Sequence, residues 1–459
     1  MDIRFKKDLN LLEQGDSVRK ISVKLLQKIC ANGGHSHEIL PAFLNRLTLS
    51  QQDKSLITEL VNGTLRWSGQ LDWILSQFFR GDFKKSPVAL RRILELSLYQ
   101  LRFLDKIPAF AAVSEGVDLA KESGGEPWAR LVNGLLRNYL RNADSVEFPA
   151  IRENPVQALS VRYSHPKWLV KRWLARYGLE ETRRFCEYNN QRPNISLRVN
   201  LKEISREDLI LELKKSSVRV QPSDYFADFV RVQKLGNLSQ LPAYKEGKFA
   251  IQDESTALAS LLLAPEKGDT VLDMCAAPGG KTCHLAQLVG GDGKVIAIDN
   301  RRNRLNLLRE NVSRLKLACV YGVVADSTTL EVAPVDKVLL DAPCSGLGVL
   351  AKRADLRWKR RERDIHTIRA TQKRLLENGA RLLKAGGTLV YSTCTLEPEE
   401  TQDLILEFLH ENQHFQIDCT DIAALQPFST KEGFWASFPS KHRLDGVFAA
   451  RLIKKIKNN

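Results

Sequence analysis

The chain has 459 residues, of which 43% are hydrophobic and 27% are charged. This length predicts two or three domains, each large enough to bury a core of its own. The formal net charge of +15 favours a polyanionic partner such as nucleic acid over a small neutral substrate. A basic soluble enzyme without such a partner is the alternative interpretation.

The cysteines and the apolar segments indicate the compartment. The eight cysteines include no Cys-x-x-Cys pair and no compact cluster with histidine, so we expect neither a metal site nor a disulfide framework. Reduced thiols are typical of a cytoplasmic protein. Residues 1–8 lack the apolar core of a signal peptide, and no later run approaches the roughly 18 apolar residues of a membrane span.

The first third of the chain has the apolar periodicity of helices. Apolar residues recur three and four positions apart from about residue 21 to residue 141, and glycine or proline interrupts the pattern at Gly81, Pro87, Pro108 and 124–125. This pattern predicts an all-α bundle. The periodicity ends near residues 142–155.

A small α+β bridging module is expected over residues 145–250. Residues 195–199 are strand-like, and residues 206–215 have a helical pattern. His165 precedes a proline at a helix start, where a capping or packing role fits better than catalysis.

From residue 252 onward, strands and helices alternate. The expected strands are 270–274, 294–299, 319–326, 337–340 and 388–391, and 446–453 could add a closing strand. The expected helices between them are 281–288, 302–315 and 365–383. This alternation predicts a doubly wound, largely parallel sheet.

Two cysteines follow two of these strands. Cys344 lies in the segment Asp341-Ala342-Pro343-Cys344, and Cys394 lies in Ser392-Thr393-Cys394-Thr395. Parallel strands end at the same edge of a sheet, where such sheets bind their ligands. We therefore expect both thiols over one pocket, whereas the other five cysteines outside the loop at Cys275 are expected to be small buried residues.

The loop after the first of these strands predicts a cofactor site. Residues 275–282 are small and open a helix, so that backbone N–H groups can approach a ligand. A phosphate-binding loop of an NTPase would need glycine in place of Cys275, and the dinucleotide pattern of alternating glycines is not met. S-adenosylmethionine is the class that remains.

Acidic residues at the strand ends support this interpretation. Asp299 follows Gly280 by 19 residues, close to the spacing at which an acidic side chain meets ribose hydroxyls, and Asp326 would lie beside the adenine. Helix capping is the alternative role for these residues, but three aspartates on successive strands, with Asp341 as the third, make it a poor account.

A basic segment lies between the two cysteine motifs. Residues 352–363 are rich in lysine and arginine and include Trp358, and the basic character continues at 373–374. Cationic residues with an aromatic ring suit a single-stranded or flipped-out RNA base. A solvated helix face is the alternative.

Two sets of motifs resemble known families. Residues 60–66, 98–101, 107–108 and 131–138 resemble the RNA-binding domain of the NusB type. Residues 275–281, 341–346 and 392–395 resemble the signature motifs of the Nop/Sun family of RNA cytosine-5 methyltransferases, and the pairing with a NusB-like domain resembles members acting on 16S ribosomal RNA.

The resemblance implies a multidomain protein and specific residue roles. The domains would be 1–144 (NusB-like, all-α), 145–250 (bridging) and 251–459 (Rossmann-like, catalytic). The residues implied to bind S-adenosylmethionine are Cys275, Ala276, Ala277, Pro278, Gly279, Gly280, Lys281, Asp299, Asp326 and Asp341. Cys394 would be the nucleophile, and Cys344 would assist product release. Ala354 and Val447 depart from the family pattern, which puts substrate fit in doubt more than reaction type.

The chemistry explains why two thiols would be needed. Carbon 5 of cytosine is a poor nucleophile, and attack of a thiolate on carbon 6 makes it reactive through a covalent intermediate. The site should therefore favour a thiolate through nearby positive charge or hydrogen-bond donors. We expect a cytoplasmic, monomeric enzyme that acts on 16S ribosomal RNA. A non-catalytic RNA-binding or assembly factor and a phosphate-loop NTPase are the alternatives.

Overall fold

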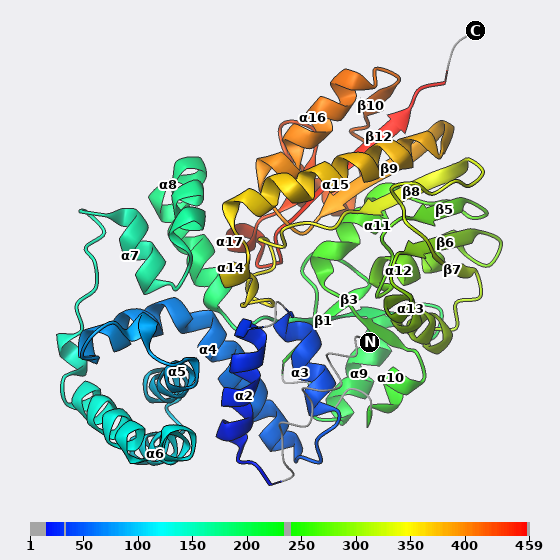
Figure 1. Cartoon of the computed structure of the whole chain (residues 1–459). Coiled ribbons are helices and arrows are strands. Elements are labelled where there is room, and N and C mark those ends of the chain that lie inside the picture. Colours follow the sequence, from blue (N-terminus) through cyan, green and yellow to red (C-terminus); the bar gives the residue numbers. More distant parts are fainter. Residues whose placement is uncertain (1–14, 32–33, 234–239, 457–459) are drawn as a thin grey trace. The chain divides into compact units, whose positions relative to one another are not determined.

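The computed structural model describes residues 15–31, 34–233 and 240–456, so the predictions on residues 1–8 lie outside the described part. The chain forms two compact units (Figure 1). The first, here called the helical unit, comprises residues 1–191 and 350–360; the second, the sheet unit, comprises residues 192–349 and 361–459. Long helices make up the first unit, as the periodicity predicted.

The helical unit contains the predicted breaks between its helices. The longer helices are α2 (Val18–Ala31), α3 (Ser36–Leu44), α4 (Gln51–Phe78), α5 (Val88–Phe103), α6 (Ala109–Arg141), α7 (Pro155–Arg162) and α8 (Lys167–Asn190). Ser50 begins α4 because its side chain accepts a hydrogen bond from the backbone N–H of Asp53. The break at residues 124–125 is a kink inside α6, where Gly125 has a φ of 72°.

Glycine allows α4, α5 and α6 to pack closely. A Cβ atom on Gly63 would lie 2.0 Å from the ring of Tyr99, and one on Gly116 would lie 2.4 Å from the hydroxyl of Ser97. Leu60, buried in the same cluster, completes the apolar side of α4. The NusB-like motif at residues 60–66 is therefore a packing motif of the bundle.

The basic segment is divided between enclosed and exposed residues: Arg361 and Arg363 are exposed, in contrast to the more enclosed residues 350–360. Residues 350–360 pack within the helical unit and include the short helix α14 (Leu356–Lys359). Asp355 is 1% exposed and accepts hydrogen bonds from Ser36, and Arg357 is completely buried. Within residues 350–360, only Trp358 has a large exposed fraction, 37%. Charge in the sequence therefore does not by itself distinguish the buried part of this segment from the exposed part.

The sheet unit begins with a small antiparallel sheet of order β2-β3-β1-β4. Its elements are β1 (Ile195–Val199), α9 (Arg206–Lys215), β2 (Arg219–Pro222), β3 (Phe229–Gln233), α10 (Pro242–Lys245) and β4 (Phe249–Ile251). The predicted strand 195–199 and helix 206–215 are both present. Helices α7 and α8, which precede this sheet in the chain, belong to the helical unit.

The larger sheet has the order β10-β12-β9-β8-β5-β6-β7, with β11 paired to β12. Its strands are β5 (Thr270–Asp273), β6 (Lys294–Asp299), β7 (Val320–Val324), β8 (Val335–Asp341), β9 (Leu383–Thr393), β10 (Phe415–Ile417), β11 (Trp435–Ser437) and β12 (Val447–Lys454). Strands β5 to β9 are parallel, and β12 closes the sheet antiparallel to β9. The prediction of a largely parallel sheet with a closing strand is confirmed.

Helices cover both faces of this sheet (Figure 1). They are η5 (Glu254–Thr256), α11 (Ala257–Leu263), α12 (Gly280–Val289), α13 (Arg302–Arg314), α15 (Glu362–Arg381), η6 (Pro398–Glu400), α16 (Gln402–Glu411), η7 (Ala423–Phe428) and α17 (Pro439–His442). Leu339 of β8 packs in the core cluster of α11 and α12, whereas its neighbour Val338 faces Gly379 of α15. This alternation places α15 on the opposite face from α11 and α12.

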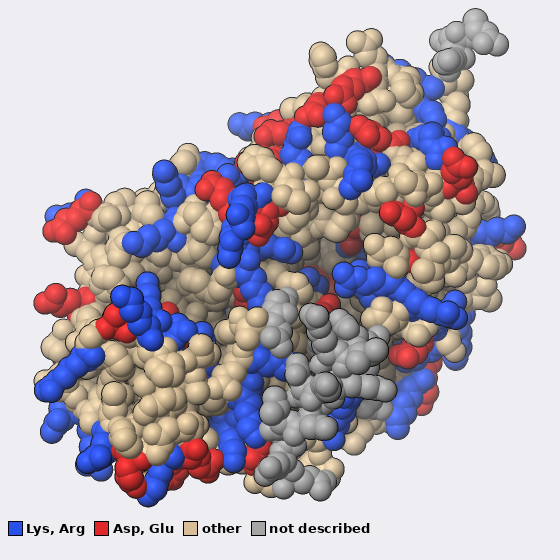
Figure 2. Space-filling view, in the orientation of Figure 1, with Lys and Arg blue, Asp and Glu red and all other residues tan. Residues whose placement is uncertain are grey.

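The positive charge is spread over the surface. On the face shown in Figure 2, lysine and arginine side chains are distributed with acidic side chains among them. Across the described residues, no helix has the length and apolar composition needed to cross a membrane. No group of three or more histidine, cysteine, aspartate or glutamate side chains in that part could hold a metal ion.

Candidate active site

The two predicted cysteines meet at the carboxyl end of the parallel sheet. Strands β8 and β9 are neighbours in which Asp341 pairs with Ser392, so the residues that follow each strand leave the sheet side by side. The sulfur atoms of Cys344 and Cys394 lie 3.0 Å apart, and both residues are half-buried. The expectation of two thiols at one sheet edge is confirmed.

The loops that carry the two cysteines are bound to each other. The backbone N–H of Gly348 donates to the carbonyl of Cys394 at 3.0 Å, and the Ser345 hydroxyl donates to Thr395 Oγ1 at 3.0 Å. Gly348 must be glycine, because a Cβ atom would lie 2.0 Å from the carbonyl oxygen of Gly446. The positions of the two sulfur atoms are thus fixed by backbone packing.

Glu400 and Gln372 were missed by the sequence analysis and support the Cys344 loop from beneath. Glu400 is completely buried, and its Oε1 accepts hydrogen bonds from the N–H of Ser345 at 2.8 Å and from Gln372 at 3.1 Å. Gln372 also donates to the carbonyl of Pro343 at 2.9 Å. Burial raises the pKa of Glu400. The acidic run 397–400, directly after the second cysteine motif, was the available signal.

Lys281 brings positive charge to the thiols. Its ammonium group donates to Asp341 Oδ2 at 2.7 Å, which joins the loop after β5 to the end of β8. Burial lowers the pKa of Lys281, but Asp341 and then Cys394 raise it more, so the pKa is raised overall. The sequence analysis placed Lys281 in the cofactor loop; the structure turns its side chain towards Asp341. The cation expected beside the thiols is therefore present.

The predicted cofactor loop, residues 275–281, is held by α13. Arg304 donates to the carbonyl of Ala277 at 2.6 Å, and Asn311 donates to the carbonyl of Pro278 at 3.1 Å. Gly279, with a φ of 105°, precedes α12, and its own N–H donates to the carbonyl of Ala276. The peptide bond before Pro278 is cis. The loop thus forms a fixed turn at the start of a helix.

The acidic strand ends differ in environment. Asp299 is 4% exposed, accepts a hydrogen bond from the backbone N–H of Arg301 at 2.9 Å, and lies 3.3 Å from Arg304. Asp326 is exposed and accepts two hydrogen bonds from Thr328, which lower its pKa. Asp299 pairs in register with Val324, two residues before Asp326. Both carboxylates therefore follow neighbouring strands, at the same edge as the thiols.

A fourth carboxyl group, Asp273, was not predicted. It ends β5, is 1% exposed, and accepts a hydrogen bond from the hydroxyl of Thr282 at 2.7 Å. Burial raises its pKa to about 7. Burial likewise raises the pKa of Cys275, two residues later, well above the ordinary thiol value. Burial thus favours the protonated forms of both groups.

The remaining predicted details fall outside this site. His165 is buried and packs edge-on against Trp173, which agrees with a packing role. Val447 lies in the core of the large sheet. Cys186, Cys283 and Cys319 are buried as expected, but Cys30 and Cys419 are exposed, so the prediction is wrong for these two.

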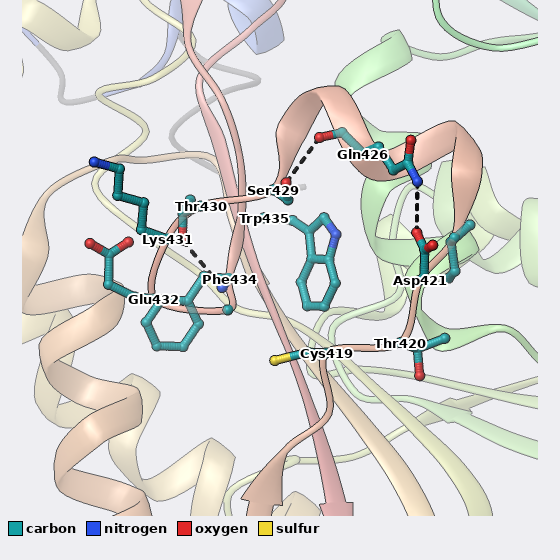
Figure 3. Close-up of a pocket in the computed structure, with 12 residues that line it drawn as sticks. Cys419, Thr420, Asp421, Gln426, Ser429, Thr430, Lys431, Glu432, Phe434 and Trp435 are labelled. Atoms are coloured by element: carbon teal, nitrogen blue, oxygen red, sulfur yellow. Dashed lines mark hydrogen bonds between the residues drawn. The ribbon is translucent and has the colours of Figure 1, made fainter.

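A cavity of about 500 Å³ elsewhere on the sheet unit holds none of the predicted site residues. Residues 419–422, 426 and 429–435 line it, and Trp435 and Phe434 stand beside it (Figure 3). Its polar groups are bonded to each other: Gln426 donates to Asp421 at 3.0 Å. Neither Cys344 nor Cys394 lines this cavity.

Comparison with known proteins finds matches to three successive regions of the chain. A model of the 16S rRNA methyltransferase RsmB/F matches residues 260–453, the NusB family matches 16–141, and the ferredoxin-like domain of RsmF/B-like methyltransferases matches 165–239. The ribosomal RNA small subunit methyltransferase B of Proteus mirabilis is 34% identical over 443 residues, which cover 96% of this chain and 99% of that protein. The chain belongs to the RsmB/F methyltransferase family.

Another relative and one solved structure are also similar to the chain. The ribosomal RNA small subunit methyltransferase B of Cronobacter sakazakii is 32% identical over 455 residues, which cover 98% of this chain and 100% of that protein. The crystal structure of NSun6 from Pyrococcus horikoshii with SFG has a TM-score of 0.58 and 26% identity, over 64% of this chain and 99% of that one. The predicted family, with its NusB-like domain, is confirmed.

Proposed function

We propose that the protein transfers a methyl group from S-adenosylmethionine to carbon 5 of a cytosine in 16S ribosomal RNA. The observation that carries this proposal is the 3.0 Å approach of Cys344 and Cys394 at the carboxyl end of a parallel sheet. Membership of the RsmB/F family supports the substrate class. The reaction would proceed through a covalent bond between Cys394 and carbon 6 of the base.

The charges around the two thiols support Cys394 as the nucleophile. The hydrogen bond to Cys394 and then burial raise the pKa of Cys344 well above its ordinary value, so Cys344 keeps its proton. Two thiols this close ionise one at a time, since two adjacent negative charges repel each other. Cys394, which lies near the ammonium group of Lys281, is then the thiolate that adds to carbon 6.

Cys344 takes the second role. Once Cys394 Sγ is bonded to carbon 6, it carries no negative charge, and the main cause of the high pKa of Cys344 is gone. Cys344 can then lose its proton to solvent and, as a thiolate, accept the proton from carbon 5. The electrons of that C–H bond restore the ring double bond and expel Cys394 as a thiolate. Asp341, at the end of β8, is near enough to the thiols to meet the polar edge of the base.

The loop at 275–281 and the strand ends fit S-adenosylmethionine. When bound, this cofactor supplies a methyl group activated by a positively charged sulfonium. Asp299 and Asp326 follow neighbouring strands and would accept hydrogen bonds from the ribose and lie beside the adenine, respectively. Gly280 at the start of α12 leaves room for close approach, because a Cβ atom there would lie no nearer than 3.6 Å to any neighbour. The carboxylates of Asp299 and Asp326 also suit a cationic ligand.

Two cysteine variants test the proposal. We expect Cys394→Ala to transfer no methyl group from labelled S-adenosylmethionine to small-subunit RNA, because the covalent step is lost. Cys344→Ala should retain attack but not release, and should accumulate a covalent protein–RNA adduct that migrates slowly on a denaturing gel. Cys419→Ala is the matched control, since that thiol is exposed and lies at the other cavity.

The outcomes separate the candidate functions. Undiminished methyl transfer by Cys394→Ala would refute the nucleophile assignment, and Cys344→Ala without an adduct would refute the release role. RNA binding without methyl transfer by the unaltered protein would instead favour the non-catalytic RNA-binding factor. Methylated nucleotides from the wild-type reaction should be 5-methylcytosine when identified by mass spectrometry.

A further inference from the structure

A cavity of about 450 Å³ lies on the helical unit, within the size range of small-ligand pockets. Helices α4, α7 and α8 contribute to it, and so does the segment 350–360 through Trp358. None of the residues with a proposed role in methyl transfer lines it. This cavity is therefore distinct from the proposed methyl-transfer site at Cys394.

Two indole rings form part of the wall. The indole N–H of Trp358 donates to the carbonyl of Leu65 at 2.8 Å, and that of Trp73 donates to the carbonyl of Glu147 at 2.8 Å. These bonds fix each ring, so little side-chain freedom would be lost when a planar ligand stacks on it. Trp358 is 37% exposed, whereas the other residues of 350–360 are buried or half-buried.

Cationic groups stand at the rim. Lys84 and Lys167 line the cavity and are exposed, and neither has an ion-pair partner within the described ranges. The side-chain amide of Gln157, also in the wall, has no hydrogen-bond partner among the same residues. An amide offers both a donor and an acceptor to the edge of a base.

His165 adds a neutral acceptor to the wall. Its Nδ1 lies 2.7 Å from the carbonyl oxygen of Tyr163, so the proton is on Nδ1 and donates to that oxygen. Nε2 has no hydrogen-bond partner in the described part of the chain, although the residue is only 1% exposed. Burial, followed by the charge of Arg357, lowers the pKa of His165 well below its ordinary value.

We propose that this cavity binds an unpaired nucleobase of the RNA, which stacks on Trp358 and Trp73 while flanking phosphates lie against Lys84 and Lys167. Aromatic faces combined with cations are how proteins hold single-stranded nucleic acid. A peptide partner would suit the apolar wall, but it would leave the two ammonium groups without an anion. The cavity would thus hold the RNA at a second point.

The proposal rests on the proposed function in one respect, that the substrate is RNA. The test measures the affinity of full-length variants for a fluorescein-labelled, 12-nucleotide single-stranded RNA by anisotropy. Trp73→Leu removes the aromatic face, whereas Trp73→Phe keeps it; both lose the indole hydrogen bond, so their difference isolates stacking. We expect Trp73→Leu to bind about 5- to 100-fold more weakly than Trp73→Phe.

Charge is tested with two matched double variants. Lys84→Glu with Lys167→Glu removes the rim cations, and Lys85→Glu with Lys171→Glu makes the same change in charge at exposed neighbours outside the cavity. Only the first pair should weaken binding. Its plot of log affinity against log salt should be shallower by about 1.4, because each lost phosphate contact on a single strand removes about 0.7.

Equal affinities of Trp73→Leu and Trp73→Phe, together with equal affinities of the two double variants, would overturn the proposal. Methyl transfer measured on the same preparations keeps this separate from the proposed function. If the wild-type protein transfers methyl groups and the cavity variants bind RNA normally, only the proposal for the cavity is refuted. If the wild-type protein transfers no methyl groups and the cavity variants still bind RNA more weakly, only the proposed function is refuted.

Discussion

Replacement of Arg357 by methionine should destabilise the helical unit. Arg357 is completely buried and donates to the carbonyls of Ser164 and Asn189 at 3.0 Å each and to the side-chain oxygen of Asn190 at 2.8 Å. Burial lowers its pKa from 12.5 to about 9. Burial thus disfavours the charged guanidinium, and the hydrogen bonds offset that desolvation cost.

Methionine removes both the cost and the hydrogen bonds, but it leaves three buried acceptors without donors. Each such acceptor costs about 1 kcal/mol at the lower end of the range for buried groups, so the net loss is about 3 kcal/mol. For a unit of about 200 residues, this loss lowers the unfolding temperature by about 6–12 °C. Scanning calorimetry of the full chain measures this shift.

Arg363→Met is the matched control, because that side chain is exposed and lies only six residues later in the same basic run. We expect it to unfold within about 1 °C of the wild type. If Arg357→Met also unfolded within about 1 °C of the wild type but bound RNA more weakly, the structural account of residues 350–360 would be wrong. The basic segment would then be an RNA-binding surface, as its composition first indicated.

Three further variants test the charges. Burial and then Asp72 raise the pKa of Glu95 from 4.5 to about 8, so between these values the folded state keeps a proton that the unfolded state releases. The free energy of unfolding therefore falls as the pH rises from about 5 to 8. In urea titrations, Glu95→Gln should remove that fall. Glu400→Gln should lower the pKa of Cys344, because the charge of Glu400 disfavours ionisation of that thiol. The rate of alkylation of Cys344 measured against pH should then rise at a lower pH than in the wild type. An unchanged pH profile of alkylation would contradict this expectation. Asp299→Ala should weaken S-adenosylmethionine binding about 10- to 100-fold by calorimetry, with the exposed Asp292→Ala unchanged.

The parallel sheet was predictable because its signal is local. Strands β5, β6 and β8 of the large sheet are short apolar runs that are followed by helical patterns, so the edge at which Cys344 and Cys394 would meet followed from the direction of the strands alone. The length of β9 was not predictable. The strand was expected over residues 388–391, yet β9 spans Leu383–Thr393 and includes Gly387, where a Cβ atom would lie 2.8 Å from the carbonyl oxygen of Asp336.

The buried charges could not be predicted, because their partners are distant in the sequence. Arg357 is surrounded by acceptors about 170 to 190 residues earlier, and Glu400 binds an N–H group 55 residues earlier. A run of lysine and arginine has the same composition whether it is solvated or paired in the interior. The burial of Arg357 depends on where the fold places Ser164 and Asn189, and that of Glu400 depends on where it places Ser345.

The short distance between the two sulfur atoms also orders the steps of the proposed reaction. Only one thiol of the pair can be ionised, because the hydrogen bond and the charge of Cys394 hold the proton on Cys344. A base for the carbon 5 proton therefore does not exist until the charge on Cys394 has passed into the bond with carbon 6. Attack must precede deprotonation, and Glu400, whose charge raises the pKa of Cys344 further, makes premature ionisation of Cys344 still less favourable. Sequence spacing made the two cysteines neighbours, and in the proposed reaction the proton kept on Cys344 would give them unequal roles.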